Sequence, residues 1–253
     1  MSAPKALCKA VSDGNMTELR KLLPDCNVNE PSDPESKYCG KAPLHIVCES
    51  GRLNVLMLLL SIPAINVNIQ TPYLETPLYF ACQHGHIDVV HQLLGRPETN
   101  VNIASGNDWT PLHSACENGF AEIAQLLLAR SGVDVNLIAW RRTPLHLACS
   151  QGHANVVRLL LAHPNLRIPS TGPHTPLHLA AKHCHTDVIE MLLEYAATSD
   201  DSAAAALWLV FLDDAFPLDK AARSAVLKSI STRVDSSVLA NRVGSAVLGF
   251  FQS

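Results

Sequence analysis

Aromatic residues are scarce in this sequence, at 5% of 253 residues, and charged residues reach only 17%. The large rings that fill the cores of sandwiches and barrels are therefore few, which favours many small packing units over one large core. The motifs GxGxxG, GxxxxGK[ST], GxSxG, HExxH and CxxC are also absent. We therefore predict no catalytic residues and no cofactor, and an enzyme is the least favoured class.

Long basic or apolar runs are missing as well. The net charge is −4 and the only adjacent basic pairs are Arg20-Lys21 and Arg141-Arg142, so no stripe of cations could follow a nucleic-acid backbone. The longest apolar run, 203–212, has about half of the ~20 residues that a membrane-spanning helix needs. Charged residues interrupt the first fifteen residues, unlike a signal peptide. We expect an intracellular protein, cytoplasmic with the nucleus open as a second compartment, with neither nucleic-acid partner nor membrane insertion.

One ten-residue pattern is present five times along the chain. It reads APLHIVCESG, TPLYFACQHG, TPLHSACENG, TPLHLACSQG and TPLHLAAKHC, with prolines at Pro43, Pro77, Pro111, Pro144 and Pro176. The steps between these prolines are 34, 34, 33 and 32 residues. A repeat at this period is typical of a solenoid, in which each unit buries its apolar face against the next.

Each unit predicts two helices. A threonine before the proline is a helix N-cap with proline in the first turn, and the glycine eight residues after the proline suits a left-handed helix end. A second helix then carries an apolar stripe, and a Val-Asn pair leads to the next Thr-Pro. The stripe of the second unit consists of Val89, Val90, Leu93 and Leu94.

Thr-Pro-Leu-His, the turn glycine and the apolar second helix resemble the ankyrin repeat. The resemblance covers 38–197 as five units, about 38–71, 72–105, 106–138, 139–170 and 171–197. It implies an all-α solenoid of stacked helix-turn-helix units with β-hairpin-like loops. Residues 1–37 are interpreted as an N-terminal capping half-repeat and a polar loop, and 198–253 as a C-terminal helical segment, either a cap or a degenerate sixth repeat.

Two departures from the pattern fall in the terminal repeats. Ala42 replaces the capping threonine of the first, and Cys184 replaces the turn glycine of the last, where a positive φ would cost ~1–2 kcal/mol. Terminal repeats of solenoids are expected to be atypical.

Histidines and cysteines form columns when the units are stacked. One residue per repeat cannot make a disulfide or share a metal, because neighbouring helix axes lie ~8–10 Å apart. We therefore expect buried thiols, and the resemblance implies that each column histidine forms a structural hydrogen bond to the neighbouring motif. The last repeat gathers more potential ligands but lacks the spacing of closed zinc sites, so no metal is predicted. These ligands are His174, His178, His183, Cys184 and His185.

The resemblance places partner binding on the concave surface, at the hairpin tips before each Thr-Pro and at the residues before the turn glycine. These positions vary, and they hold aromatic and arginine side chains of the kind that dominates interfaces. Alternatively, Trp109 and Trp140 fold over neighbouring loops. The candidate partner-binding residues are Tyr73, Glu75, His84, Trp109, Glu117, Trp140, Arg141, Arg142 and His174.

The sequence therefore predicts a monomeric, non-enzymatic scaffold that binds a protein partner. The tail leaves a second interpretation open, because some ankyrin-repeat families carry a C-terminal helical box that recruits a ubiquitin ligase. The tail has the length of such a box but lacks its leucine-cysteine-proline pattern. An adaptor whose tail binds a second protein is therefore the alternative to a structural cap.

Overall fold

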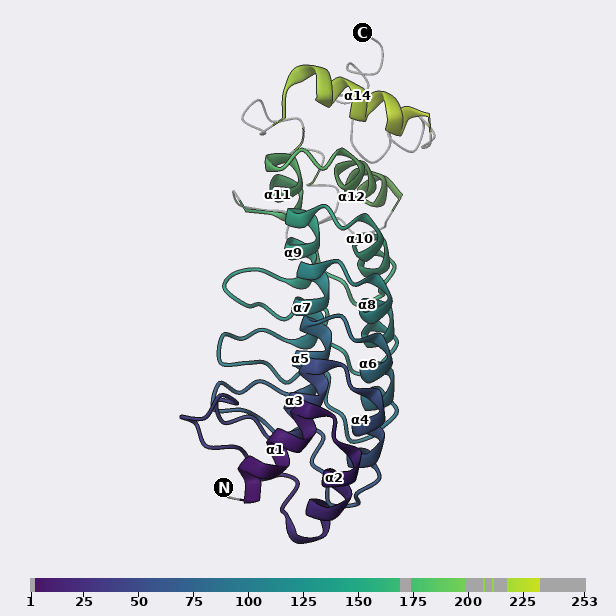
Figure 1. Ribbon diagram of the computed structural model, residues 1–253. Coiled ribbons are helices and arrows are strands. Elements are labelled where there is room, and N and C mark those ends of the chain that lie inside the picture. The colour runs from purple at the N-terminus through teal and green to yellow at the C-terminus, as the bar shows by residue number, and fades with distance from the viewer. Residues whose placement is uncertain (1–2, 169–173, 199–206, 208–210, 212–217, 233–253) are drawn as a thin grey trace. The chain divides into compact units, whose positions relative to one another are not determined.

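The computed structural model describes residues 3–168, 174–198, Leu207, Phe211 and 218–232 (Figure 1). The secondary-structure elements of this part of the chain are all helices. They divide between two compact units, residues 1–141 and 142–253. The predicted all-α repeat fold is confirmed, and the division falls after Arg141, within the first residues of the fourth repeat.

The first unit stacks four helical pairs. The first helices of the pairs, α1, α3, α5 and α7, pack in one row, and the second helices lie in a parallel row beside them (Figure 1). Leu44, Leu78 and Leu112 from the first row are buried, because apolar positions recur on the faces that meet the neighbouring pair. The helices are α1 (Ala3–Asp13), α2 (Met16–Leu22), the 3₁₀ turn η1 (Leu23–Asp25), α3 (Pro43–Ser50), α4 (Leu53–Leu60), α5 (Pro77–Gln83), α6 (Ile87–Leu94), α7 (Pro111–Asn118) and α8 (Ala121–Leu128).

The helix starts and ends follow the predicted cap chemistry. Thr76 Oγ1 accepts a hydrogen bond from the backbone N–H of Tyr79 at 3.2 Å, and Thr110 caps α7 in the same way. Ala42 offers no side-chain cap to α3. The turn glycines Gly51 and Gly85 have φ values of 68° and 74°, in the left-handed region where glycine carries no steric cost.

A side chain from the next repeat lies directly over each of three turn glycines in this unit. A Cβ atom on Gly51 would lie 2.6 Å from Nδ1 of His86, and the same imidazole bonds through Nε2 to the carbonyl of Glu49 at 2.9 Å. Arg52 covers Gly14 in this way, and Phe120 covers Gly85. These glycines therefore serve both the helix end and the close packing of successive repeats.

The asparagine of each Val-Asn pair links one repeat to the next. Asn68 Nδ2 donates to the carbonyl of Glu98 at 2.7 Å, while its Oδ1 accepts from the N–H of Asn100 at 2.9 Å. Asn29 and Asn102 make the equivalent pair of bonds to their following repeats. The sequence located these residues, but their bridging role emerges only from the structure.

The long connection before the first full repeat is a succession of turns. Ser32 N–H donates to the carbonyl of Lys41 at 3.0 Å, which closes this connection as a loop. Within it, Asp33 accepts from Ser36, and the carbonyl of Ser36 accepts from the N–H of Cys39. The loop therefore presents Lys37 and Tyr38 from a backbone held by its own hydrogen bonds.

The second unit contains two further helical pairs and a tail helix. Leu207 and Phe211 are fully buried, and α14 packs on α12 through the buried residues Val226, Leu227 and Ile230. Of the predicted C-terminal helical segment, 198–253, residues 199–206, 208–210, 212–217 and 233–253 lie outside the described residues. The helices are α9 (Pro144–Gln151), α10 (Ala154–Leu161), α11 (Pro176–Lys182), α12 (Thr186–Thr198) and α14 (Lys220–Ser231).

Cys184 has the backbone conformation that the sequence predicts for the turn-glycine position of the last repeat. Its φ is 58°, and its side chain is exposed. A left-handed conformation costs an ordinary L-residue ~1–2 kcal/mol, so the last repeat carries strain that the glycine repeats avoid.

Candidate functional site

The most exposed large apolar side chains of the described residues stand at hairpin tips of the first unit. Trp140 is 72% exposed, Tyr73 67%, Ile138 64% and Leu74 50%, a fraction that Met57 on α4 also reaches. Isolated exposed apolar residues are ordinary, whereas a group confined to loop tips marks a surface that a partner could cover.

The tips are held by short backbone hydrogen bonds. Between Thr71 and Glu75 the N–H of Thr71 donates to the carbonyl of Glu75 at 3.0 Å, and a similar bond of 2.8 Å joins Ser105 to Trp109. The N–H of Gly106 donates to the carbonyl of Tyr73 at 2.7 Å, which ties the second tip to the third. The exposed side chains therefore project from an ordered backbone, which lowers the entropy lost on binding.

A left-handed residue stands three positions before each of the first four motif prolines, Pro43, Pro77, Pro111 and Pro144. In the first full repeat it is Gly40, with φ of 75°, but Leu74, Asp108 and Arg141 occupy the same place with φ between 61° and 65°. Each of these three costs more than a glycine would, and the cost is least for aspartate. Leu74 thus occupies a tip position at which glycine would fold more easily.

The two tryptophans of the candidate set differ in exposure. Trp109 is half-buried, and its ring centroid lies 5.9 Å from that of His113 on α7. It lies against α7, a helix, whereas the alternative interpretation has both tryptophans fold over neighbouring loops, and it offers less free surface than Trp140. Trp140 itself has a positive φ of 49° and extends outward.

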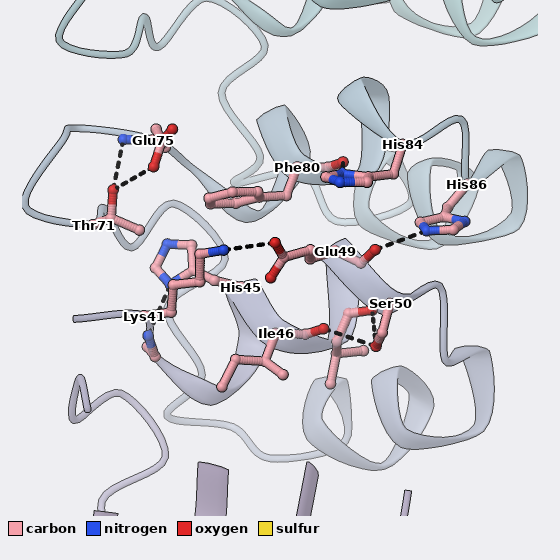
Figure 2. A network of polar contacts seen from close by, with 12 residues as sticks. Lys41, His45, Ile46, Glu49, Ser50, Thr71, Glu75, Phe80, His84 and His86 are labelled. Atoms are coloured by element: carbon pink, nitrogen blue, oxygen red, sulfur yellow. Dashed lines mark hydrogen bonds and ion pairs between the residues drawn. The ribbon is translucent and has the colours of Figure 1, made fainter. Parts of the chain in front are cut away.

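A polar and aromatic network joins the first two full repeats (Figure 2). Lys41 Nζ bonds to Glu49 Oε1 at 2.7 Å and lies 4.5 Å from the ring centroid of Phe80. The Phe80 ring also meets the buried imidazole of His45 edge-on, with centroids 5.8 Å apart. Lys41 therefore has its charge satisfied within the chain, by a carboxylate and an aromatic face.

His84 and Glu75 are partly engaged in local contacts. His84 bonds through Nδ1 to the carbonyl of Phe80 at 3.0 Å, and its ring stacks on that of His86 with centroids 6.1 Å apart. The Glu75 carboxylate accepts from the hydroxyl of Thr71 at 3.0 Å (Figure 2). Both side chains are fixed in place, and His84 remains exposed.

The remaining candidate residues differ in exposure and are divided between the two units. Glu117 lies half-buried on the last turn of α7, and Arg141 is exposed beside Trp140. Arg142 and His174 are exposed but belong to the second unit. The exposed loop residues of the first unit include Tyr73, Leu74, Ile138, Trp140 and Arg141. Sequence reasoning missed Leu74 and Ile138. Aligning the loops by distance from the proline would have placed Ile138 with Thr71 and Ser105, which are buried.

The histidine column is structural, and its electrostatics show why. His45 Nδ1 accepts from the N–H of Ala42 at 3.0 Å, so its Nε2 carries the proton that bonds the Ile69 carbonyl at 3.0 Å. Burial lowers the pKa of His45 and of His146 to about 4, so both imidazoles are neutral at pH 7. Because both nitrogens of His45 are occupied by backbone groups, neither is free for chemistry.

The cysteine column is buried and reduced. Burial raises the pKa of the thiols of Cys48, Cys82 and Cys116 well above the usual range, so none is a thiolate at neutral pH. All eight cysteines are free thiols. Their small side chains fill space between helices.

The possible ligands of the last repeat are directed elsewhere. His185 bonds through Nε2 to the carbonyl of Ser150 at 3.2 Å and covers Gly152, and His178 bonds to Thr175 at 2.8 Å. Among the described residues, no group of three or more histidine, cysteine or acidic side chains has the geometry of a metal site.

The fold defines a helical repeat protein with exposed apolar side chains at the ends of its loops. A family model described as ankyrin repeats (3 copies) matches residues 7–105, 65–139 and 138–203. The chain therefore belongs to the ankyrin-repeat family, whose repeats are generally protein-interaction modules. None of the curated proteins matches it. No helix within the described ranges combines the length and apolar character that crossing a membrane requires.

Proposed function

We propose that this chain is a non-enzymatic scaffold, acting in the cytoplasm, that binds a protein partner through the hairpin tips of its first unit. The observation that supports this most is the exposure of four large apolar side chains in these loops, Tyr73, Leu74, Ile138 and Trp140, each at least half exposed. Tyrosine and tryptophan supply large contact areas with few rotatable bonds, so they make efficient anchors.

The polar residues beside the anchors would set the charge preference of the surface. Arg141 follows Trp140 directly and is exposed, while Glu117 lies on the neighbouring helix α7. Glu75 stabilises the hairpin that carries Tyr73, because its carboxylate and its carbonyl both accept hydrogen bonds from Thr71. Charges at the rim of an interface chiefly affect specificity and association rate.

The proposal is tested by affinity capture from native lysate with quantitative mass spectrometry. Three chains are compared: the unmodified protein, Tyr73→Ala/Trp140→Ala, and the control Met57→Ala/Ile87→Ala, which removes exposed apolar side chains from α4 and α6. Partners lost only from the tip variant, with all three chains melting alike, support the tip surface. Partners kept by the tip variant would move binding elsewhere on the molecule.

We propose that α14 acts as a cap rather than as a docking site. Its apolar face is covered by the second unit, and Ser229 bonds to Glu190 of α12 at 3.0 Å. A chain ending at Thr198 exposes the face that α14 covers, so its midpoint of thermal unfolding should fall. Unchanged stability with loss of a captured protein would favour the adaptor alternative instead.

A further inference from the structure

An open pocket lies at the N-terminal end of the first unit. It has a volume of about 360 Å³ and is lined by residues of α1 and of the loop before α3. The lining residues are Lys5, Lys9, Glu35, Ser36, Lys37 and Tyr38. Three of these six side chains are cationic, although the chain as a whole has a net charge of −4.

The three lysines are not neutralised by close ion pairs. Lys5 and Lys9 are one helical turn apart on α1, so both reach the same side of that helix. Among the described residues, no carboxylate lies within 4.0 Å of the ammonium groups of Lys5, Lys9 or Lys37. Glu35 also lines the pocket and Asp13 acts on Lys37 from a distance, so the local balance is a small positive excess.

Tyr38 forms the polar wall of this pocket. Tyr38 is 8% exposed, and no described group accepts the proton of its buried hydroxyl. Lys37 Nζ lies 4.7 Å from the centre of its ring, and a hydrogen bond to the Tyr38 hydroxyl raises the pKa of Lys37. A buried O–H whose proton has no acceptor costs free energy, which a ligand oxygen accepting that proton would recover.

The pocket is adjacent to the face that holds the network of Figure 2. The carbonyl of Tyr38 accepts from the N–H of Lys41 at 2.9 Å, and Lys41 in turn reaches Glu49 and Phe80. Lys9 also stands five residues before Gly14, as Phe80 stands five before Gly85. Lys9 therefore occupies in α1 the position that Ile46 occupies in α3 and Phe80 in α5, five residues before the turn glycine.

We propose that this pocket binds an oxyanion, a carboxylate or a phosphate, carried by the partner segment that lies on the first unit. Lys5, Lys9 and Lys37 supply the positive charge, and the Tyr38 hydroxyl donates a hydrogen bond to one oxygen. Ammonium groups and hydroxyls are suitable donors for such an anion, and charge-assisted bonds are the stronger kind. This inference rests on the proposed protein-binding function. It adds that the part of the partner segment that lies at this pocket carries an anionic group.

The test is a fluorescence anisotropy titration of the full chain with labelled peptides. The probes are hexaglutamate, a six-residue glycine-serine peptide with one phosphoserine, and its unphosphorylated counterpart. We expect saturable binding of at least one anionic probe and at least about tenfold weaker binding of the neutral one, because complementary charges set such preferences. The tighter anionic probe identifies the oxyanion.

Matched variants separate a pocket from general attraction between charges. Lys9→Gln/Lys37→Gln should weaken binding of that probe at least about fivefold, and Tyr38→Phe about threefold through loss of the hydroxyl. Arg20→Gln/Lys21→Gln removes the same charge from exposed positions of α2 and should change affinity less than about twofold. An equal loss from both double variants, or none from Lys9→Gln/Lys37→Gln, would overturn the pocket.

A further variant keeps this inference distinguishable from the proposed function. Tyr73→Ala/Trp140→Ala should leave the affinity for the anionic probe unchanged, because neither residue lines the pocket. If the probes fail while this tip variant still loses captured partners, only the oxyanion site is wrong. If the probes bind while tip variants keep every partner, the pocket stands and the tip surface fails.

Discussion

The first row of helices and the hairpin tips occupy the same repeats but follow different rules. In the helices, Leu44, Leu78 and Leu112 are equivalent and fully buried. At the tips, Gly40 and Leu74 occupy one place, and the second of them carries an exposed side chain at a positive φ. The residue type is therefore the same from repeat to repeat where the side chain packs between units. It varies where the side chain stands at a loop tip.

The clearest way to break this comparison is a pair of leucine truncations. Leu112→Ala removes a buried side chain from the first row and should lower the free energy of unfolding by about 2–5 kcal/mol, through lost burial and the cavity left behind. Leu74→Ala at the tip should change it by less than about 0.5 kcal/mol. Urea unfolding followed by circular dichroism measures both, and equal losses would show that the tips are part of the core.

The turn glycines provide the next largest effect. Gly51→Ala combines a positive φ with a Cβ placed against the ring of His86, so we expect a loss of about 2–3 kcal/mol. Gly132→Ala is the matched control, because its φ is 87° but no atom lies within 4 Å of the added carbon. It should lose only the backbone share, about 1–2 kcal/mol. Equal losses of unfolding free energy in the two variants, measured by urea unfolding, would mean that the His86 ring moves aside at no cost.

Acid should unfold the helical rows through their buried histidines. The pKa of His45 and of His146 is about 4 in the folded protein and about 6.5 in an unfolded chain. The unfolded state therefore takes up protons first, and stability that is fully present above pH 6.5 is lost as the pH falls towards 4. Each histidine should contribute on the order of 2–3 kcal/mol to this loss.

The measurement is the free energy of unfolding at several pH values between 7 and 4. His45→Asn should lower stability at pH 7 and flatten its dependence on pH. The exposed His91→Asn on α6 should leave that dependence unchanged. A His45→Asn chain with the original slope would assign the acid sensitivity to other groups.

Much of the fold could be predicted because its signals are local. Thr110 before Pro111 determines a helix start by itself, and Gly51 determines a helix end, so both were placed correctly from the sequence. The Val-Asn pairs were located too, but the bonds of Asn68 reach the next repeat. Such bonds depend on how two units stack, which no single unit encodes.

The candidate surface was harder to predict for the same physical reason. Trp109 and Trp140 look alike in sequence, yet one folds over His113 and the other projects, because the backbone of each tip directs the ring. Leu74 was overlooked because its exposure follows from a left-handed backbone that leucine seldom adopts. Exposure at a tip is therefore decided by turn geometry rather than by residue type.

The smallest expected change has the opposite sign and comes from the second unit. Cys184 has the φ of a turn glycine without being one, so Cys184→Gly should raise the free energy of unfolding by about 0.5–1 kcal/mol. Cys184→Ala retains a Cβ at the same φ and should gain nothing, which separates backbone relief from removal of the thiol. Thermal and urea unfolding of both variants decide the matter. If the two variants have the same free energy of unfolding, the turn of the last repeat accommodates a side chain without strain. Gly51 would then differ from Cys184 because a side chain packs over it, and not because of its backbone conformation.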